Sequence, residues 1–315
     1  MPAVSIIIPV YNVAPYMARC ARSLFGQTLR DLEFVFVDDA STDGSLAVLE
    51  AVLAEFPARK SQVRIHRMPF NSGQAQVRMQ ALSMVTGEYV YHCDSDDEIE
   101  PDTCQCLYEK AVAEGLDIVT CNFRKEDAAG RWQEVCGACP GVEALLRDTA
   151  PPNLVCRLVR RSLFSEVVQP VADVGEDMML TIQVTLRAAR SGHVDRTFYH
   201  YRYREASTSK APGREAAVAR WKALQQNVAV LLPVLYGAGF QPDAPAVVHF
   251  KYNSRHHLEP FVGDRDVYRL WRETFPEIDR QLLFTPGIPL EKKGWFLLIH
   301  LHLFRPVKRL TRSLH

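Results

Sequence analysis

Three carboxylates directly follow an apolar run in the stretch GEYVYHCDSDDEIEPD, at Asp94, Asp96 and Asp97. Carboxylates this close repel one another unless a cation or a proton neutralises them. Their hard oxygen atoms suit Mg²⁺ or Mn²⁺, and a diphosphate would supply the remaining ligands. A metal ion there would stabilise the negative charge that grows on a departing phosphate group. Acidic turns are common, so the position of this one after a predicted strand is what makes it informative.

A second set of polar residues follows two other apolar runs, in VSIIIPVYN and FVFVDDASTDGS. Ligands of an open α/β sheet bind outside the carboxyl ends of its strands, so Tyr11, Asn12 and Asp39 should meet in one crevice. A carboxylate there can accept hydrogen bonds from a base or a ribose, and an aromatic ring can stack on the base. The pattern predicts a nucleoside site. The simpler alternative is that these residues only cap the next helix.

Two further acids, Glu176 and Asp177, stand at the start of a predicted helix over residues 176–190. Acidic side chains are favoured at helix N-termini for electrostatic reasons alone, and in isolation the pair would be interpreted that way. A carboxylate in this position can also take the proton from an attacking hydroxyl group.

The elements that must position these residues are predicted from the alternation of short apolar runs with amphipathic stretches between residue 3 and about residue 120. This alternation is typical of β–α units and a largely parallel sheet. The predicted strands are residues 4–10, 32–37, 63–68, 89–93 and 116–121. Later in the chain we expect a turn between two strands at 125–132, a short helix at 140–148, a strand at 197–203 and only helices after residue 210. Pro101 is expected in the first turn of a helix that ends at Gly115.

The composition bounds the class of protein. The chain has 315 residues, 47% of them hydrophobic, with 37 basic and 37 acidic side chains, so it can bury a full core and no nucleic-acid partner is expected. The N-terminus lacks a basic segment before its apolar run, and no apolar run is long enough to span a bilayer, which predicts a soluble, cytoplasmic protein. The eight cysteines are expected to be reduced, and the lone pair Cys136 and Cys139 is not expected to bind zinc.

Five segments taken together resemble family 2 of the glycosyltransferases. They are VSIIIPVYN, VDDASTDGS, NSGQAQVRMQAL, GEYVYHCDSDDEIEPD and GEDMMLT, in the family's order, over roughly residues 3–210. The resemblance implies a GT-A fold, which is a Rossmann-like, mainly parallel sheet flanked by helices. It also implies an inverting transfer from a nucleotide sugar, commonly a UDP-sugar, with Mn²⁺ or Mg²⁺ on the diphosphate. We therefore expect a catalytic domain over residues 1–210 and a helical C-terminal region over residues 211–315.

The resemblance also implies roles for single residues. Asp177 would be the catalytic base, and Asp96 the metal ligand. The donor nucleotide would be bound by Pro9, Tyr11, Asn12, Asp39, Asn71, Arg78, Asp94, Ser95 and Arg204. The segment around Arg78 departs from the family pattern at Val77, Met79 and Ala81, so its detailed contacts do not carry over.

Some features leave alternatives open. His200 is either a further metal ligand or a packed ring, and Ser207 or Ser209 would donate to the donor phosphates. The C-terminal stretch GWFLLIHLHLFRPVKRLTRSLH either lies on an anionic membrane surface, at the inner face of the membrane, or packs on protein. The acceptor would be a saccharide or a lipid-linked saccharide, and the oligomeric state is not predicted.

Two other classes of protein compete with this interpretation. A nucleotidyltransferase would share the nucleotide site and the acidic metal ligands, but it has no use for Asp177 as a base. A catalytically idle binding protein of the same fold would have lost one of the acidic roles, and none is missing. A nicotinamide-dependent dehydrogenase is disfavoured because no G-x-G-x-x-G sequence follows a predicted strand.

Overall fold

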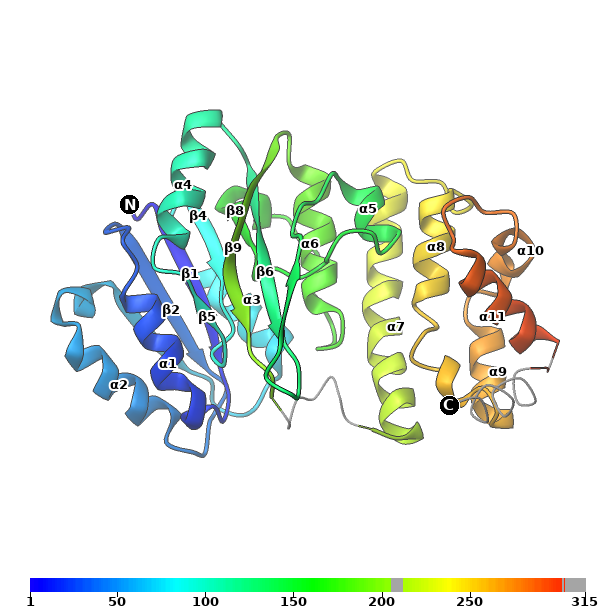
Figure 1. Cartoon of the computed structure of the whole chain (residues 1–315), viewed down its shortest axis with the longest axis horizontal. Coiled ribbons are helices and arrows are strands. Elements are labelled where there is room, and N and C mark those ends of the chain that lie inside the picture. The colour runs from blue at the N-terminus through cyan, green and yellow to red at the C-terminus, as the bar shows by residue number, and fades with distance from the viewer. Residues whose placement is uncertain (205–211, 302, 304–315) are drawn as a thin grey trace. The chain divides into compact units, whose positions relative to one another are not determined.

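The structure is a computed structural model that describes residues 1–204, 212–301 and 303. The chain forms two compact units, which are drawn in Figure 1. The first comprises Met1–Val142 and Ala150–Glu205, and the second comprises Glu143–Thr149 and Ala206–His315. Among the described residues, those predicted to be catalytic, to bind metal or to bind the donor nucleotide lie in the first unit.

A nine-stranded sheet forms the centre of the first unit, in the strand order β3-β2-β1-β4-β8-β6-β9-β5, with β7 paired to β6. Its strands are β1 (Val4–Val10), β2 (Leu32–Asp38), β3 (Val63–Arg67), β4 (Tyr89–His92), β5 (Glu98–Ile99), β6 (Ile118–Glu126), β7 (Trp132–Val135), β8 (Arg157–Arg160) and β9 (Ser191–Tyr201). The first four strands in the order are parallel to one another, as predicted. Beyond β4 the sheet is mixed, since β8 runs antiparallel to β4 and β6, whereas β9 is parallel to β6.

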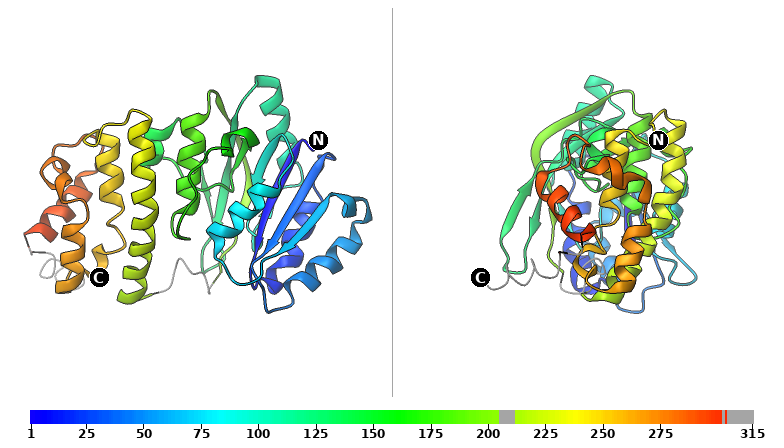
Figure 2. Two further views of the ribbon diagram at one scale, coloured as in Figure 1. Left: turned by 180° about the vertical axis from the view of Figure 1, so that it is seen from behind. Right: turned by 90° about the vertical axis from the view of Figure 1, so that its right-hand side faces the viewer.

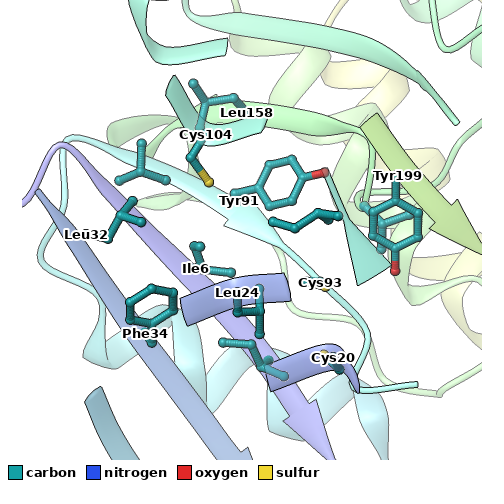
Figure 3. Packing of buried hydrophobic residues seen from close by; sticks show 14 of the residues in the cluster. Ile6, Cys20, Leu24, Leu32, Phe34, Tyr91, Cys93, Cys104, Leu158 and Tyr199 are labelled. Carbon is teal, nitrogen blue, oxygen red and sulfur yellow. The ribbon is translucent and has the colours of Figure 1, made fainter. Parts of the chain in front are cut away.

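Helices cover both faces of this sheet because successive strand residues point to opposite sides. The helices are α1 (Ala14–Phe25), α2 (Ser45–Glu55), α3 (Gln74–Met84), α4 (Thr103–Glu114) and α6 (Glu176–Arg187). Ile6 of β1 packs in the core cluster of α1, α2 and α4, together with Leu24 (Figure 3). The next residue, Ile7, packs in a second cluster with Val77 of α3 and Val184 of α6. The near-continuous apolar pattern of β1 is therefore that of a strand buried on both faces.

Some element boundaries differ from those that the sequence predicts. Strand β8 was not predicted, because its sequence RLVR carries two arginines in four residues. Helix α4 begins at Thr103, so Pro101 precedes the first turn and does not lie in it, whereas Gly115 does end the helix in a left-handed conformation. Helix α6 ends at Arg187, and β9 begins at Ser191, earlier than predicted, because its first half pairs with β6 without an apolar pattern.

The second unit is helical in its described part. It contains α5 (Val142–Leu146), α7 (Arg214–Gly237), α8 (Pro245–Asn253), α9 (Arg265–Glu273), α10 (Asp279–Leu282) and α11 (Leu290–His300), and α7 and α8 lie side by side (Figures 1 and 2). Its core gathers around the buried ring of Trp271, which contacts Phe296 of α11. Among the described residues, no helix is both long and apolar enough to cross a membrane.

Candidate active site

The acidic residues after β4 form a turn, in which the N–H of Asp97 donates to the carbonyl of Asp94 over 3.1 Å. Ser95 and Asp96 occupy the middle of this turn, and Ser95 is buried. Burial and repulsion from Asp94 raise the pKa of Asp96, and the nearby guanidinium of Arg204 partly offsets that rise. The arrangement concentrates negative charge at the carboxyl end of a central strand.

Arg78 of α3 connects this turn to the start of α6. Its side chain is only 2% exposed, and one terminal nitrogen lies 2.8 Å from Oδ1 of Asp94. Its Nε lies 3.4 Å from a carboxylate oxygen of Glu176, and its other terminal nitrogen lies 3.2 Å from Nδ1 of His92. Burial acts to lower the pKa of Arg78, but Asp94 and Glu176 outweigh it and raise that pKa overall, so the guanidinium stays charged. The two acidic segments, about 80 residues apart in the chain, therefore share one buried cation.

The acid pair opens α6, as the sequence predicts. Gly175 precedes it with a φ of 82°, in the left-handed region where glycine is favoured, and so lets the chain turn into the helix. Burial and the neighbouring Asp177 raise the pKa of Glu176 to about 8. Burial also raises the pKa of Asp177, whereas the charge of Arg78 acts to lower it. Oδ1 of Asp177 accepts a hydrogen bond from the N–H of Met178 over 2.7 Å. Both carboxyl groups of the pair therefore have a pKa above its ordinary value.

The ends of β1 and β2 meet as expected. Asn12, with a φ of 49°, accepts a hydrogen bond from the N–H of Thr42 through its side-chain oxygen, and its own N–H donates to Ser41. Asp39 is buried, and its two carboxylate oxygens accept hydrogen bonds from the N–H groups of Ser72 (2.6 Å) and Gly73 (2.9 Å). The carboxylate of Asp39 therefore holds the loop before α3, whatever else it binds.

Gly73 has a backbone conformation that no other residue would adopt without strain, with a φ of 87°. A Cβ atom at this position would lie 2.5 Å from the nearer carboxylate oxygen of Asp173. Asp173 in turn accepts a hydrogen bond from the N–H of Ala75, in the first turn of α3, over 2.9 Å. Close packing of a carboxylate against the start of α3 thus explains the glycine.

Arg204 follows β9 and reaches back to the acidic turn. One terminal nitrogen lies 3.4 Å from Oδ2 of Asp96, the other lies 3.4 Å from the carbonyl oxygen of Asn12, and the guanidinium lies over the ring of Tyr16. The side chain of Arg204 therefore links the predicted metal ligand to the end of β1. Ser207 and Ser209, the other residues predicted to contact phosphate, lie outside the described residues.

The remaining predicted residues lie at the same edge of the sheet. Tyr11 is 45% exposed, Asn71 is exposed, and Pro9 is half-buried at the end of β1. His200 differs from the expectation of a metal ligand. Its Nε2 lies 2.6 Å from Glu100 and its Nδ1 accepts from Nε of Arg124 over 2.8 Å, so both ring nitrogens have partners, and the ring packs on Trp132.

The residues present fit a divalent cation bound together with a diphosphate. No three His, Cys, Asp or Glu side chains in the described part of the chain are grouped to hold a metal ion by themselves, so phosphate oxygens would have to supply further ligands. Asp96 offers a hard oxygen donor with a side chain that is 27% exposed. A cation there would offset the repulsion between Asp94 and Asp96.

Sequence reasoning assigned no role to three side chains that shape this site, namely Tyr199, Asp173 and His92. Tyr199 contacts the acidic turn from β9, and Asp173 holds the start of α3. Burial and the charge of Arg78 lower the pKa of His92 well below its ordinary value, so this ring is neutral beside the guanidinium. Only Asp173 carried a local signal, since it stands two residues before the G-E-D sequence.

An open α/β sheet with acidic residues at the carboxyl ends of its strands is an arrangement typical of nucleotide-binding domains. Residues 5–138 match the family described as Glycosyl transferase family 2. The glycosyltransferase GlyA of Streptococcus pneumoniae serotype 4 is 26% identical over 249 residues, which are 74% of this chain and 35% of GlyA. The chain thus spans about a third of the length of GlyA.

Two solved structures share the fold at low sequence identity. S. aureus TarS 1–349 in complex with UDP has a TM-score of 0.68 and 18% identity, over 100% of this chain and 92% of TarS 1–349. The mannosyltransferase PcManGT from Pyrobaculum calidifontis, in complex with GDP-Man and Mn²⁺, has a TM-score of 0.53 and 20% identity, over 98% of this chain and 87% of PcManGT. Residues 5–138 are thus similar to glycosyltransferase family 2, and the predicted GT-A fold is confirmed.

Proposed function

We propose that this protein is an inverting glycosyltransferase that moves a sugar from a UDP-sugar onto a saccharide or a lipid-linked saccharide. The observation that carries the proposal is the position of Arg78, whose buried guanidinium contacts both Asp94 and Glu176. This one side chain ties the acidic turn to the acid pair at the start of α6. The residues that would bind the donor and the residue that would deprotonate the acceptor therefore belong to one site.

Asp177 is the proposed general base. In a single displacement the acceptor oxygen bonds to the anomeric carbon while the bond from that carbon to the diphosphate oxygen breaks, and the acceptor proton passes to Asp177. Burial strengthens Asp177 as a base, because it raises the pKa of this group. The positive charge of Arg78 keeps the ionised form of Asp177 accessible by opposing that rise.

Asp96 is the proposed ligand of a divalent cation. A bound Mn²⁺ or Mg²⁺ would neutralise the negative charge that develops on the leaving nucleoside diphosphate. Arg204, which lies beside Asp96, is placed to pair with phosphate oxygens once the cation takes over the carboxylate. Support for a cation comes from PcManGT, whose solved complex contains Mn²⁺.

The nucleoside is proposed to lie against the ends of β1 and β2, where the exposed ring of Tyr11 can stack on a base. Uracil is the base we favour, since TarS 1–349 has been solved in complex with UDP. PcManGT was solved with GDP-Man, so guanine is the alternative to be excluded by experiment.

Calorimetric titration of the protein with UDP, GDP and CDP, each with and without Mn²⁺, tests the proposed donor site. We expect UDP to bind more tightly than the other two nucleotides, and Mn²⁺ to strengthen that binding. In the Asp96→Ala variant the effect of Mn²⁺ should disappear, whereas Asp243→Ala, at an exposed position of the second unit, should behave as the wild type. If none of the three nucleotides binds, the proposal is wrong. If GDP binds most tightly, the donor is a GDP-sugar and not a UDP-sugar.

The exposed face of α11 is proposed to lie on an anionic membrane surface. Leu290, Leu297 and Leu301 are seven and four residues apart, so they form one stripe along the helix, and Leu290 is 85% exposed. Phe284, just before this helix, is equally exposed. Lys293 borders the stripe, and the sequence continues with Lys308, Arg309 and Arg312, which lie outside the described residues. Basic residues beside an apolar stripe favour anionic lipid over a second protein.

A further inference from the structure

The third carboxylate of the acidic turn, Asp97, has no role in the metal and nucleotide binding described above. Its side chain is buried, at 2% exposure, in contrast to the partly exposed Asp96. Both of its oxygens are already engaged within the protein. Oδ2 accepts a hydrogen bond of 2.6 Å from the hydroxyl of Tyr199, and Oδ1 accepts one of 2.8 Å from the N–H of Arg202. Asp97 is therefore turned away from any ligand that the turn would bind.

Tyr199 contacts both ends of the same turn. Its hydroxyl donates to Asp97, and the oxygen of that hydroxyl accepts a hydrogen bond of 3.2 Å from the N–H of Asp94. The ring itself is fully buried in the core cluster that also contains Ile6 and Tyr91 (Figure 3), so the hydroxyl is held in place by packing. One rigid phenol thus connects the first and last residues of a four-residue turn.

The strand that carries Tyr199 also sets the other contacts of the turn. Strand β9 ends at Tyr201, and the next residue, Arg202, uses its N–H to hold Asp97, while Arg204 contacts Asp96. The guanidinium of Arg202 is in turn fixed by an ion pair of 2.7 Å with Glu98. The acidic turn therefore rests on the end of β9 through a set of contacts that leaves the carboxylate of Asp96 on the accessible side.

We propose that Tyr199 and Asp97 are positioning residues, which clamp the acidic turn on β9 and so orient Asp96 toward a divalent cation bound with the donor diphosphate. This inference rests on the proposed function, because it assigns the two residues to the same cation site. The physical reason is that a ligand side chain on a short turn binds a cation well only when the turn itself is held in one conformation. The side chains of Tyr199 and Asp97 are not expected to touch the cation or the nucleotide.

Removal of the Tyr199 hydroxyl tests the proposal, and calorimetric titration with UDP in the presence and absence of Mn²⁺ provides the measurement. In Tyr199→Phe the buried ring remains, but the bridge between Asp94 and Asp97 is lost. We expect affinity for UDP in the presence of Mn²⁺ to fall by about 10- to 100-fold, the range typical of residues that orient metal ligands. Affinity for UDP without metal should fall much less than affinity with Mn²⁺, because the nucleoside contacts proposed for the ends of β1 and β2 do not involve the turn.

Tyr91 provides a matched control. It is a second fully buried tyrosine of the same core cluster, on β4, and its hydroxyl has no hydrogen-bond partner among the described residues. Tyr91→Phe removes the same atom from the same kind of environment, so it should leave UDP binding unchanged with and without Mn²⁺. Equal losses in the two variants would mean a general effect on the core and would overturn the positioning role.

Asp97→Asn serves as a second probe if Tyr199→Phe does not fold, with thermal unfolding as the check of folding. The amide keeps one oxygen for the N–H of Arg202 but cannot accept the hydrogen bond from Tyr199 at its nitrogen, so a loss of the Mn²⁺ effect is again expected. If Mn²⁺ strengthens UDP binding by the same factor in the wild type and in every folded variant of Tyr199 and Asp97, the positioning role is wrong. If the wild type itself does not bind UDP, it is the proposed function that fails.

Discussion

At the scale of single residues, the two adjacent acids of α6 serve different purposes. Glu176 faces the buried guanidinium of Arg78 over 3.4 Å, and this contact anchors the start of the helix. Asp177 carries the proposed catalytic role. Burial raises the pKa of both side chains, and the positive charge of Arg78 opposes this rise at each of them.

The Asp177→Asn variant tests the base directly. The amide has nearly the same shape but cannot take the proton from the hydroxyl group of the acceptor. We therefore expect turnover to fall by at least about 100-fold, which is the lower end of the effect of a general base. UDP affinity should change little, since the lost interaction acts in the transition state. Steady-state kinetics on a UDP-sugar substrate and calorimetry on UDP measure the two quantities. Turnover like that of the wild type would remove Asp177 from the mechanism.

The raised pKa of Glu176 predicts a dependence of stability on pH. The folded-state pKa, about 8, exceeds the ordinary value of 4.5, so the folded protein binds this proton more tightly than the unfolded chain. The resulting stabilisation is complete below about pH 4.5 and is lost as pH rises toward 8 and above. The thermal unfolding midpoint of the wild type should therefore decline between about pH 5 and pH 8.5. In Glu176→Gln this decline should be smaller. Glu50→Gln, at an exposed position of α2, should keep the decline, and identical slopes in all three proteins would refute this prediction.

At the scale of elements, the start of α3 is the part of the site most dependent on backbone conformation. Asp39 holds the N–H groups of Ser72 and Gly73 from one side, and Asp173 holds the N–H of Ala75 from another. Two carboxylates from distant parts of the chain thus set the direction of the helix that carries Arg78. Displacing this helix start would disturb the proposed nucleotide site and the acidic turn together.

Gly73→Ala tests this arrangement. The new Cβ would force an unfavourable positive φ and would meet Asp173, so we expect a loss of stability of about 1–3 kcal/mol and weaker binding of UDP. Gly44 precedes α2 with a φ of −80° and open space around its Cα. Gly44→Ala should change stability by less than about 0.5 kcal/mol. Urea unfolding measures both variants, and equal effects would show that strain at Gly73 is not what matters.

At the scale of the whole molecule, the chain combines a sheet-based unit with a unit that is helical in its described part, and the described residues of this second unit include none of the predicted site residues. Our proposal for the second unit is the membrane-facing stripe of α11. An enzyme whose acceptor is linked to a lipid gains from such a contact, because both partners are then confined to the same surface.

Sedimentation with vesicles tests the membrane contact. We expect binding to vesicles that contain about 30% phosphatidylglycerol, weak binding to pure phosphatidylcholine, and a loss of binding at high salt. The double variant Leu297→Glu and Leu301→Glu should no longer bind. Val112→Glu, which places the same charge at an exposed apolar position of α4, should bind like the wild type. A doubled mass in light scattering without vesicle binding would identify a second copy of the chain as the partner instead.

The fold class of this protein and its resemblance to a family of glycosyltransferases could be predicted from its sequence because their signals are local. Each central strand is an apolar run buried on both faces, and each strand end places its polar residues at the same edge of a parallel sheet. The acid pair Glu176 and Asp177 begins a helix whose start was predicted correctly and whose end lies three residues before the predicted one. The catalytic and binding roles of these residues stay predictions.

Only the tertiary structure decided the contacts between segments that lie far apart in the chain. Tyr199 meets Asp97 across 102 residues and Asp173 meets Ala75 across 98 residues. No local pattern reports such pairs, since each depends on the order in which strands join the sheet, and the unpredicted strand β8 separates β4 from β6. Residue types and their spacing therefore determined which groups could do chemistry, whereas strand order determined which of those groups hold the others in place.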